Sequence, residues 1–408
     1  MIGSLLRRQQ RTTFLLASGL STAGSFAGLT AKGWLLLDSS QEPLLLALHF
    51  ALLSLPTLVA SGPAGTITDQ LGSELVLRRA QWGLFGAAAL AAVAIPSSGG
   101  SLQAALLLLS TLGIGIASTF ELTARNKYVA LLVDQPDQLG RYLASFSVVF
   151  NVGKLIGPPV GALLLATTGP TLALTLDACS YLFPIATLLW VMQPNRQMEQ
   201  RTSRGQEASL GDAWHACGAD LRHVLVFTAA ACLVGFFHPG LAPLIAHELL
   251  GASPYALGVF TSVLAAGSIS AGLLLQQKAR WLAERPGLLL GTCTLVTALC
   301  QVGLALQGPR LWSLAMAFGI GAGTASLLAG TNLILQVKVT QVLRGRVAGL
   351  GQIAFLGGGG LSGLLAAGIS REFGLWTCCG LLGSLGILLA IWELSRRGRR
   401  RLAAFRSA

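Results

Sequence analysis

Twelve apolar runs follow one another along the chain, separated by short segments that carry charges, prolines and glycines. A helix of about 20 apolar residues is long enough to cross the hydrocarbon core of a bilayer. Of the 408 residues 53% are apolar and 11% are charged, whereas a soluble domain has about 25% charged residues. The chain is therefore too poor in charge to cover a surface in water. These features predict an all-α integral membrane protein with twelve transmembrane helices.

The longest polar stretch, residues 193–221, lies between the sixth and the seventh apolar run. We interpret it as a cytoplasmic linker between two pseudo-symmetric six-helix bundles, residues 1–192 and 222–395, followed by a basic tail over 396–408. Such paired bundles are typical of secondary transporters, whose substrate site lies at the interface of the repeats. The expected spans are 12–37, 43–65, 75–95, 102–123, 141–166, 171–192, 222–247, 255–276, 287–307, 311–334, 345–370 and 374–395.

The basic residues predict how the chain is oriented in the membrane. Lys and Arg number 28 against 16 Asp and Glu, which gives a net charge of +12. All basic residues fall on one side of the twelve-span arrangement, with the exceptions of Lys32, Lys154, Arg310 and Arg371. Because cytoplasmic loops carry the excess of Lys and Arg, both termini are expected in the cytoplasm and the protein in the plasma or inner membrane. The basic run at 396–401 fits anionic lipid head groups, not nucleic acid.

Segments that partly match motifs of enzymes and metal sites lack the ligands or the structural context that those motifs require. His247 begins a stretch like HExxH, but Gly251 stands where the second zinc ligand is needed. Residues 358–363 match GxGxxG formally, yet they lie inside an apolar span and follow no strand, so close helix packing is the better interpretation. The chain has no GxxxxGK[ST] loop, and its 7 cysteines include no CxxC pair. We expect no enzymatic activity, no cofactor and no metal.

Charged residues inside the apolar spans are candidate functional groups, because a charge in hydrocarbon is costly unless it faces protein or water. They are Lys32, Lys154, Glu121 and Asp177. Lys32 and Asp177 are expected at similar depth, roughly 8–10 Å below the outer surface, so they pair if spans one and six meet. Otherwise Lys32 extends its amine to the interface.

The two intramembrane carboxylates are the candidates for proton coupling. Burial favours the neutral form of a carboxyl group, and renewed access to water favours its ionised form. As a hypothesis, either Glu121 or Asp177 takes up the proton that drives transport. For Glu121 the alternative is an ordinary pair with Arg125, four residues further along the same helix.

Two glycine-containing segments predict close contacts and tight turns. Between spans two and three, Gly65 and Gly72 permit tight turns on either side of Asp69, a carboxylate placed to meet a positive helix end or an arginine. Arg78 and Arg79 follow a turn later and are the expected source of that positive charge. The alternative interpretation is a solvated turn with ordinary inside-positive charge.

Span five carries Gly153, Gly157 and Gly161 at positions i, i+4 and i+8, which form one face that a neighbouring backbone can approach. Pro158 interrupts the backbone ladder of this span and is expected to kink it. At the entry of span eleven, Gln336 precedes two arginines, Arg344 and Arg346. Their guanidinium groups either clamp helix-end carbonyls and loop carboxylates or only orient the span in the membrane.

These segments resemble signatures of the major facilitator superfamily. The loop from Gly65 to Gly72 is similar to G-x-L-x-D-R-x-G-R/K, although Gln70 replaces the arginine. Span five resembles the G-x-x-x-G-P-x-x-G segment of the exporters in the superfamily. Span six resembles D-A-x-S-Y/F-L at residues 177–182, and residues 336–347 resemble the Q…LRGRV signature. Over about residues 12–395 the order of these segments is similar to the enterobactin-exporter and macrolide-efflux branch.

The resemblance implies proton-coupled export of a small amphipathic compound, such as a drug, siderophore or metabolite. It implies alternating access around a cavity lined by spans one, four, seven and ten, with the loop at Asp69 acting as a charge lock that is made and broken. The expected partners are the substrate, protons and membrane lipids, and the protein is expected to be a monomer. The alternatives are a transporter of lysophospholipids or other lipids with the same fold, an importer, or a membrane scaffold that does not transport.

Overall fold

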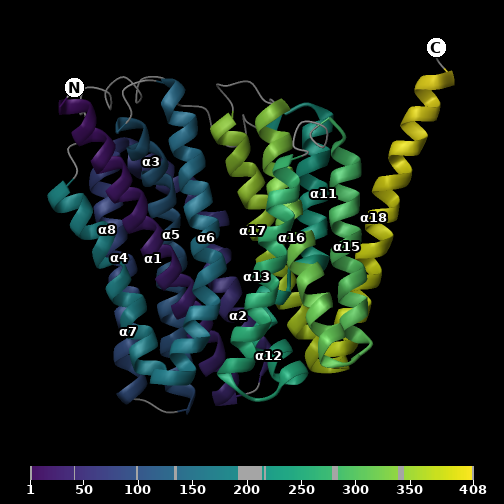
Figure 1. Ribbon diagram of the computed structural model, residues 1–408, viewed down its shortest axis with the longest axis horizontal. Helices are drawn as coiled ribbons and strands as arrows, with labels where there is room; N and C mark the ends of the chain where they lie inside the picture. Colours follow the sequence, from purple (N-terminus) through teal and green to yellow (C-terminus); the bar gives the residue numbers. More distant parts are fainter. Residues whose placement is uncertain are drawn as a thin grey trace. The chain divides into compact units, whose positions relative to one another are not determined.

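The computed structural model describes residues 2–40, 42–97, 100–132, 136–191, 214–215, 217–277, 284–338 and 344–406. Throughout these residues the regular secondary structure is helical, with no strand (Figure 1). Helices satisfy all their backbone hydrogen bonds within one segment, which is what a chain inside a bilayer requires. The predicted all-α class is confirmed.

The chain divides into two compact units. The first consists of Met1–Gln41, Leu55–Glu207 and Ser253–Gly258, and the second of Glu42–Ser54, Ala208–Ala252 and Val259–Ala408. Two short segments, Glu42–Ser54 and Ser253–Gly258, are therefore grouped with the opposite half of the chain. Most of the predicted linker 193–221 lies outside the described residues, and the predicted domain boundaries stay a prediction.

In the first unit α1 packs against α6 and α7, and α4 packs against α5 and α7. A cluster of buried side chains around Phe14, Tyr128 and Phe146 fills the space between α1, α5 and α6. The elements of this unit are α1 (Ile2–Ser40), α3 (Pro56–Leu71), α4 (Ser73–Ser97), α5 (Gly100–Leu131), α6 (Pro136–Thr168), α7 (Pro170–Ser180), α8 (Leu182–Ala186) and the π-helical turn η1 (Thr187–Val191).

In the second unit α15 packs against α16 and α18, and α17 packs against α2 and α11. Its core includes Phe227, Phe236 and Phe355. The elements of this unit are α2 (Pro43–Ser54), α11 (Ala219–Gly235), α12 (His238–Leu250), α13 (Pro254–Gln277, whose start is grouped with the first unit), α15 (Pro286–Ala305), α16 (Arg310–Lys338), α17 (Arg344–Phe373) and α18 (Leu375–Arg406).

Each of the twelve expected spans coincides with a helix or with consecutive short helices. By length and composition, 11 helical segments within the described residues are long and apolar enough to cross a membrane. The remaining span is α4, which has 25 residues but carries Glu74, Arg78 and Arg79 in its first two turns. After Arg79 the helix continues without a charged residue to Ser97.

The span formed by α11 and α12 is broken at Phe236 and Phe237. Pro239 lies in the first turn of α12 and has no N–H, so it cannot donate to the carbonyl of Gly235, the residue four positions earlier. The break places the C-terminal end of α11 inside the second unit.

Candidate functional site

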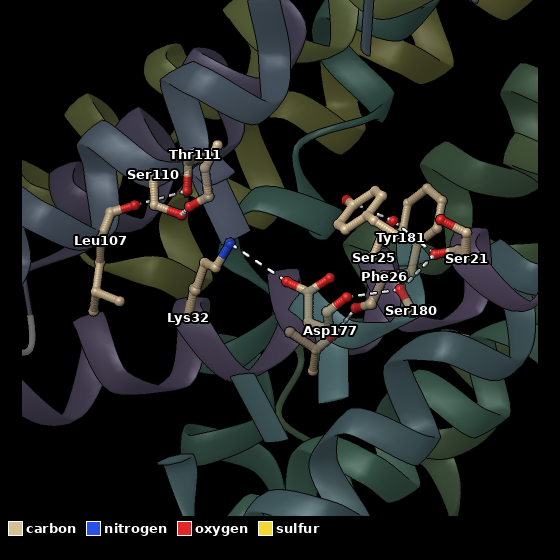
Figure 2. A network of polar contacts seen from close by, with 12 residues as sticks. Ser21, Ser25, Phe26, Lys32, Leu107, Ser110, Thr111, Asp177, Ser180 and Tyr181 are labelled. Carbon is tan, nitrogen blue, oxygen red and sulfur yellow. Dashed lines mark hydrogen bonds and ion pairs between the residues drawn. The ribbon is translucent and has the colours of Figure 1, made fainter. Parts of the chain in front are cut away.

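Lys32 on α1 and Asp177 on α7 meet in the interior of the first unit (Figure 2). The Lys32 Nζ atom lies 3.6 Å from Asp177 Oδ2, and both side chains are 0% exposed. The expected pairing of these residues is therefore present. The alternative, in which the Lys32 amine reaches out to the interface, is wrong because its side chain has no exposed surface.

Glycines on α1 make room for this pair. A Cβ atom on Gly28 would overlap the Asp177 carboxylate, and a Cβ atom on Gly24 would overlap the side chain of Ser180. Both glycines lie on the face of α1 that ends at Lys32, since residues three and four apart share a helix face. Sequence reasoning missed these glycines, although their spacing from Lys32 was a usable signal.

Hydroxyl groups extend the polar contact between α1 and α7. The Oγ atom of Ser25 lies 2.7 Å from the Tyr181 hydroxyl oxygen and 2.7 Å from the carbonyl oxygen of Ser21. Ser180 donates to the backbone carbonyl of Asp177 at 2.7 Å. Figure 2 shows these groups side by side, next to the ion pair.

The buried negative charge of the Asp177 carboxylate has few stabilising partners. Neither of its oxygens accepts a hydrogen bond from the residues that the structure describes. Lys32 is its ion-pair partner, at a separation longer than a hydrogen bond. A buried ionised carboxylate needs both a counter-charge and hydrogen bonds. Uptake of a proton at Asp177 would remove this demand, but it requires that the Lys32 ammonium be solvated when its counter-charge is lost.

The negative charge of Glu121, on α5, has more hydrogen-bond donors than that of Asp177. Arg125 donates to Glu121 Oε1 from Nη1 at 2.9 Å, and Gln81 donates to the same oxygen at 3.4 Å. The Arg125 guanidinium lies 5.5 Å from the centroid of the Phe146 ring, within cation–π range. The expected pair with Arg125 is present, so the two candidate carboxylates have separate partners.

Asp69 finds its positive partner on α5. Lys127 Nζ lies 2.5 Å from Asp69 Oδ1 and also donates to the carbonyl of Gly65 at 3.4 Å. The expected source of charge was Arg78 or Arg79, and this is corrected: within the described residues the ion pair of Asp69 is with Lys127. Arg78 is half-buried and Arg79 is exposed on α4.

The two glycines beside Asp69 differ in their conformation. Gly72 ends α3 with φ 86°, and its N–H donates to the backbone carbonyl of Thr68 at 3.1 Å, so the turn expected there is confirmed. Gly65 lies inside α3, and the turn expected at that position is wrong. A Cβ atom on Gly65 would have no neighbour within 4 Å.

The glycine face of α6 lies against the backbone of α1. A Cβ atom on Gly157 would come within 2.7 Å of the Ala23 carbonyl oxygen, and one on Gly161 would overlap the backbone of Ala27. Gly153 makes a similar approach to α1. The helix continues through Pro158 to Thr168.

The remaining predicted residues belong to α6, α16 and α17. Lys154 is half-buried on α6. Gln336 belongs to α16, and Arg344 and Arg346 belong to the first turn of α17, but their side chains lie outside what the structure describes.

Known proteins are similar to this chain over most of its length. The family model described as "transmembrane secretion effector" matches residues 4–400. A multidrug efflux pump, Tap of Mycolicibacterium fortuitum, is 26% identical over 361 residues, which are 85% of this chain and 86% of that protein. Tap of Mycobacterium tuberculosis is 23% identical over 373 residues, 88% of this chain and 87% of that protein.

Solved structures share the fold. A variant of the nucleoside transporter NupG superposes with a TM-score of 0.74 at 12% identity, covering 95% of this chain and 99% of that one. A D-xylose–proton symporter superposes with a TM-score of 0.70 at 14% identity, covering 94% and 96%. With the twelve matched spans and the family match, these comparisons give the conclusion that the chain belongs to the transmembrane secretion effector family of major facilitator superfamily transporters.

Proposed function

We propose that the protein is a secondary active exporter, which moves a small amphipathic compound out of the cell in exchange for protons by alternating access. The relatives named multidrug efflux pumps support export of small compounds. The single observation that carries proton coupling is the buried Asp177 carboxylate, which has a cation 3.6 Å away and accepts no hydrogen bond from the described residues.

In this proposal Asp177 changes its protonation as the transporter changes its access. In the closed site the carboxylate is ionised and pairs with the buried Lys32. When the site opens, water solvates the Lys32 ammonium, so Asp177 can take up a proton without leaving a buried charge unpaired. A proton taken up from one side and released to the other in this way links export to the proton gradient. Glu121, which has two donors on one oxygen, then serves as a positioning residue.

The proposal includes the orientation and state of the protein. The asymmetry of Lys and Arg along the chain supports both termini on the cytoplasmic side of the cell membrane. We take the monomer as the functional unit, since each chain has its own buried pair.

Proteoliposomes with an imposed pH gradient test the coupling. The probes are ethidium as an amphipathic cation and a fluorescent lysophospholipid as the test of the lipid-transport alternative. We expect wild-type protein to exchange ethidium across the membrane without the gradient, and to accumulate ethidium against its concentration only when the gradient is present. Asp177→Asn should lose the response to the gradient but keep ethidium exchange without it, and Glu121→Gln should keep both.

Two results would reject parts of the proposal. Wild-type coupling in both variants would exclude Asp177 and Glu121 as the coupling sites. Movement of the lysophospholipid alone would favour the lipid transporter. In the native host, deletion of the gene should raise the intracellular level of the exported compound relative to the medium, and the opposite change would indicate import.

A further inference from the structure

A groove opens on the surface of the first unit, where α3, α4 and α5 meet. In this region α3 packs closely against α5 and only lightly against α4. The groove has a volume of about 270 Å³, slightly less than the roughly 300–1,000 Å³ of pockets for drug-sized ligands. Its walls include Ile67 and Leu71 of α3, Arg79 and Gly83 of α4, and Ala117 and Phe120 of α5.

The walls suit a hydrocarbon chain. Apart from Arg79, every residue that lines the groove is apolar or glycine, so no other wall side chain can form a hydrogen bond with a ligand. Gly83 is exposed, and a Cβ atom there would have one neighbour, Ala117 Cβ at 3.4 Å. The missing side chain at position 83 therefore keeps the groove open.

Arg79 adds a positive charge to these apolar walls. It lies in the second turn of α4, roughly 9 Å from the start of the helix by the rise per residue. Its side chain is exposed, and it belongs to none of the ion pairs within the described residues. The carboxylate of Asp69 on α3 pairs with Lys127 instead. A guanidinium group can bind a phosphate through two parallel hydrogen bonds.

Trp82 supports a position of Arg79 at the level of the lipid head groups. The two residues are three positions apart and share a face of α4. Trp82 is 49% exposed, and its indole ring packs edge-on against Phe85 with 5.8 Å between the ring centroids. Exposed tryptophans on membrane helices are enriched where the hydrocarbon meets the head groups.

We propose that the groove binds one anionic phospholipid, with the lipid phosphate on Arg79 and an acyl chain between α3, α4 and α5. A zwitterionic lipid offers the same chain, but the positive charge of its head group offsets the attraction to arginine. A soluble phosphate has no chain to fill the apolar walls. The bound lipid would join α3 to α4, the side on which α3 has little direct contact.

This lipid is a resident ligand and not the exported compound. The site therefore goes beyond the proposed export and does not depend on it, because lipid binding is measurable without transport.

Native mass spectrometry of the purified full-length protein in detergent tests the site. The probes are dioleoyl phosphatidylglycerol, dioleoyl phosphatidylcholine with the same chains, and glycerol 3-phosphate, which has none. We expect phosphatidylglycerol to bind about fivefold more tightly than phosphatidylcholine, since one basic residue near the membrane surface contributes about 1 kcal/mol toward anionic lipid. Glycerol 3-phosphate should not be retained.

Variants connect the charge preference to Arg79. Arg79→Gln should bind phosphatidylglycerol about fivefold more weakly and lose the preference over phosphatidylcholine. Arg78→Gln is the matched control: it removes the same charge from the neighbouring position, but Arg78 is half-buried and does not line the groove. This control should keep the preference.

A second pair of variants connects the binding to the shape of the groove. Gly83→Leu places a side chain in the space for the acyl chain and should weaken the binding of both phospholipids. Gly86→Leu adds the same side chain about one turn later, at an exposed position outside the groove. This variant should bind both lipids like the wild type.

The proposal fails if the wild-type protein binds phosphatidylglycerol and phosphatidylcholine equally, since the groove would then hold bulk lipid without selection. It also fails if either Arg79→Gln or Gly83→Leu, checked as monodisperse by gel filtration, binds phosphatidylglycerol like its control. Neither result would bear on the proton-driven accumulation of ethidium.

Discussion

Lys32 and Asp177 form an ion pair from which water is fully excluded, with 3.6 Å between Nζ and Oδ2. Each charge alone would be far more costly in this position than the two together. Removing only one member therefore leaves a buried charge without its partner, whereas removing both does not.

Removal of one member should destabilise the protein strongly. For Lys32→Met and for Asp177→Leu we expect the free energy of unfolding to fall by about 3–5 kcal/mol, because a buried charge is left without its partner. Denaturant titration in mixed micelles measures this change. The double variant should recover to within about 1–2 kcal/mol of the wild type, and a double loss equal to the sum of the single losses would contradict the ion pair.

The glycine face of α6 should not accept a side chain. In Gly161→Ala the new methyl group meets the backbone of Ala27, so we expect a loss of about 1–3 kcal/mol in the free energy of unfolding. In Gly86→Ala on α4, where a Cβ atom has no neighbour within 4 Å, the same change should be neutral or gain up to about 1 kcal/mol. Equal effects would show that α1 and α6 are not in close contact.

The pair of Asp69 and Lys127 should affect transport more than stability. Their side chains are 46% and 33% exposed, and such pairs contribute at most about 1 kcal/mol. We expect Asp69→Asn and Lys127→Gln to slow ethidium transport in proteoliposomes while the melting temperature stays nearly unchanged. The swap of Asp69→Lys with Lys127→Asp should restore part of the rate. An equal loss in Arg78→Gln would favour the arginine as the partner instead.

A second polar contact, between Glu393 and His223, joins α18 to α11. Glu393 Oε2 lies 2.7 Å from His223 Nε2, its side chain is 6% exposed, and Arg396 contacts the same imidazole. Glu393→Leu should lower the free energy of unfolding by about 1–3 kcal/mol because buried partners lose their hydrogen bonds. Glu393→Gln keeps a hydrogen-bond acceptor and should lower the free energy of unfolding by less. Glu372→Leu, at an exposed position on α17, is the control, and a loss there as large as in Glu393→Leu would contradict this assignment.

Several features could be predicted from the chain alone because local physics imposes them. The thickness of the bilayer sets the length of each apolar run, so all twelve spans were predicted. Depth along a helix follows from its rise per residue, so Lys32 and Asp177 were predicted at similar depth, with their pairing conditional on the contact between α1 and α7. The turn at Gly72 follows from the backbone freedom of glycine.

Contacts between helices distant in sequence were decided only by the tertiary structure. Hydropathy predicts that a span exists but says little about its rotation or its neighbours. Asp69 therefore pairs with Lys127 rather than with the nearby arginines, and α2 packs with α17 in the second unit. Pro239 predicts an unsatisfied carbonyl at Gly235, but only packing brings Gln301 to it. The physical reason is that a side-chain contact between helices depends on register and rotation together, and no single segment contains both.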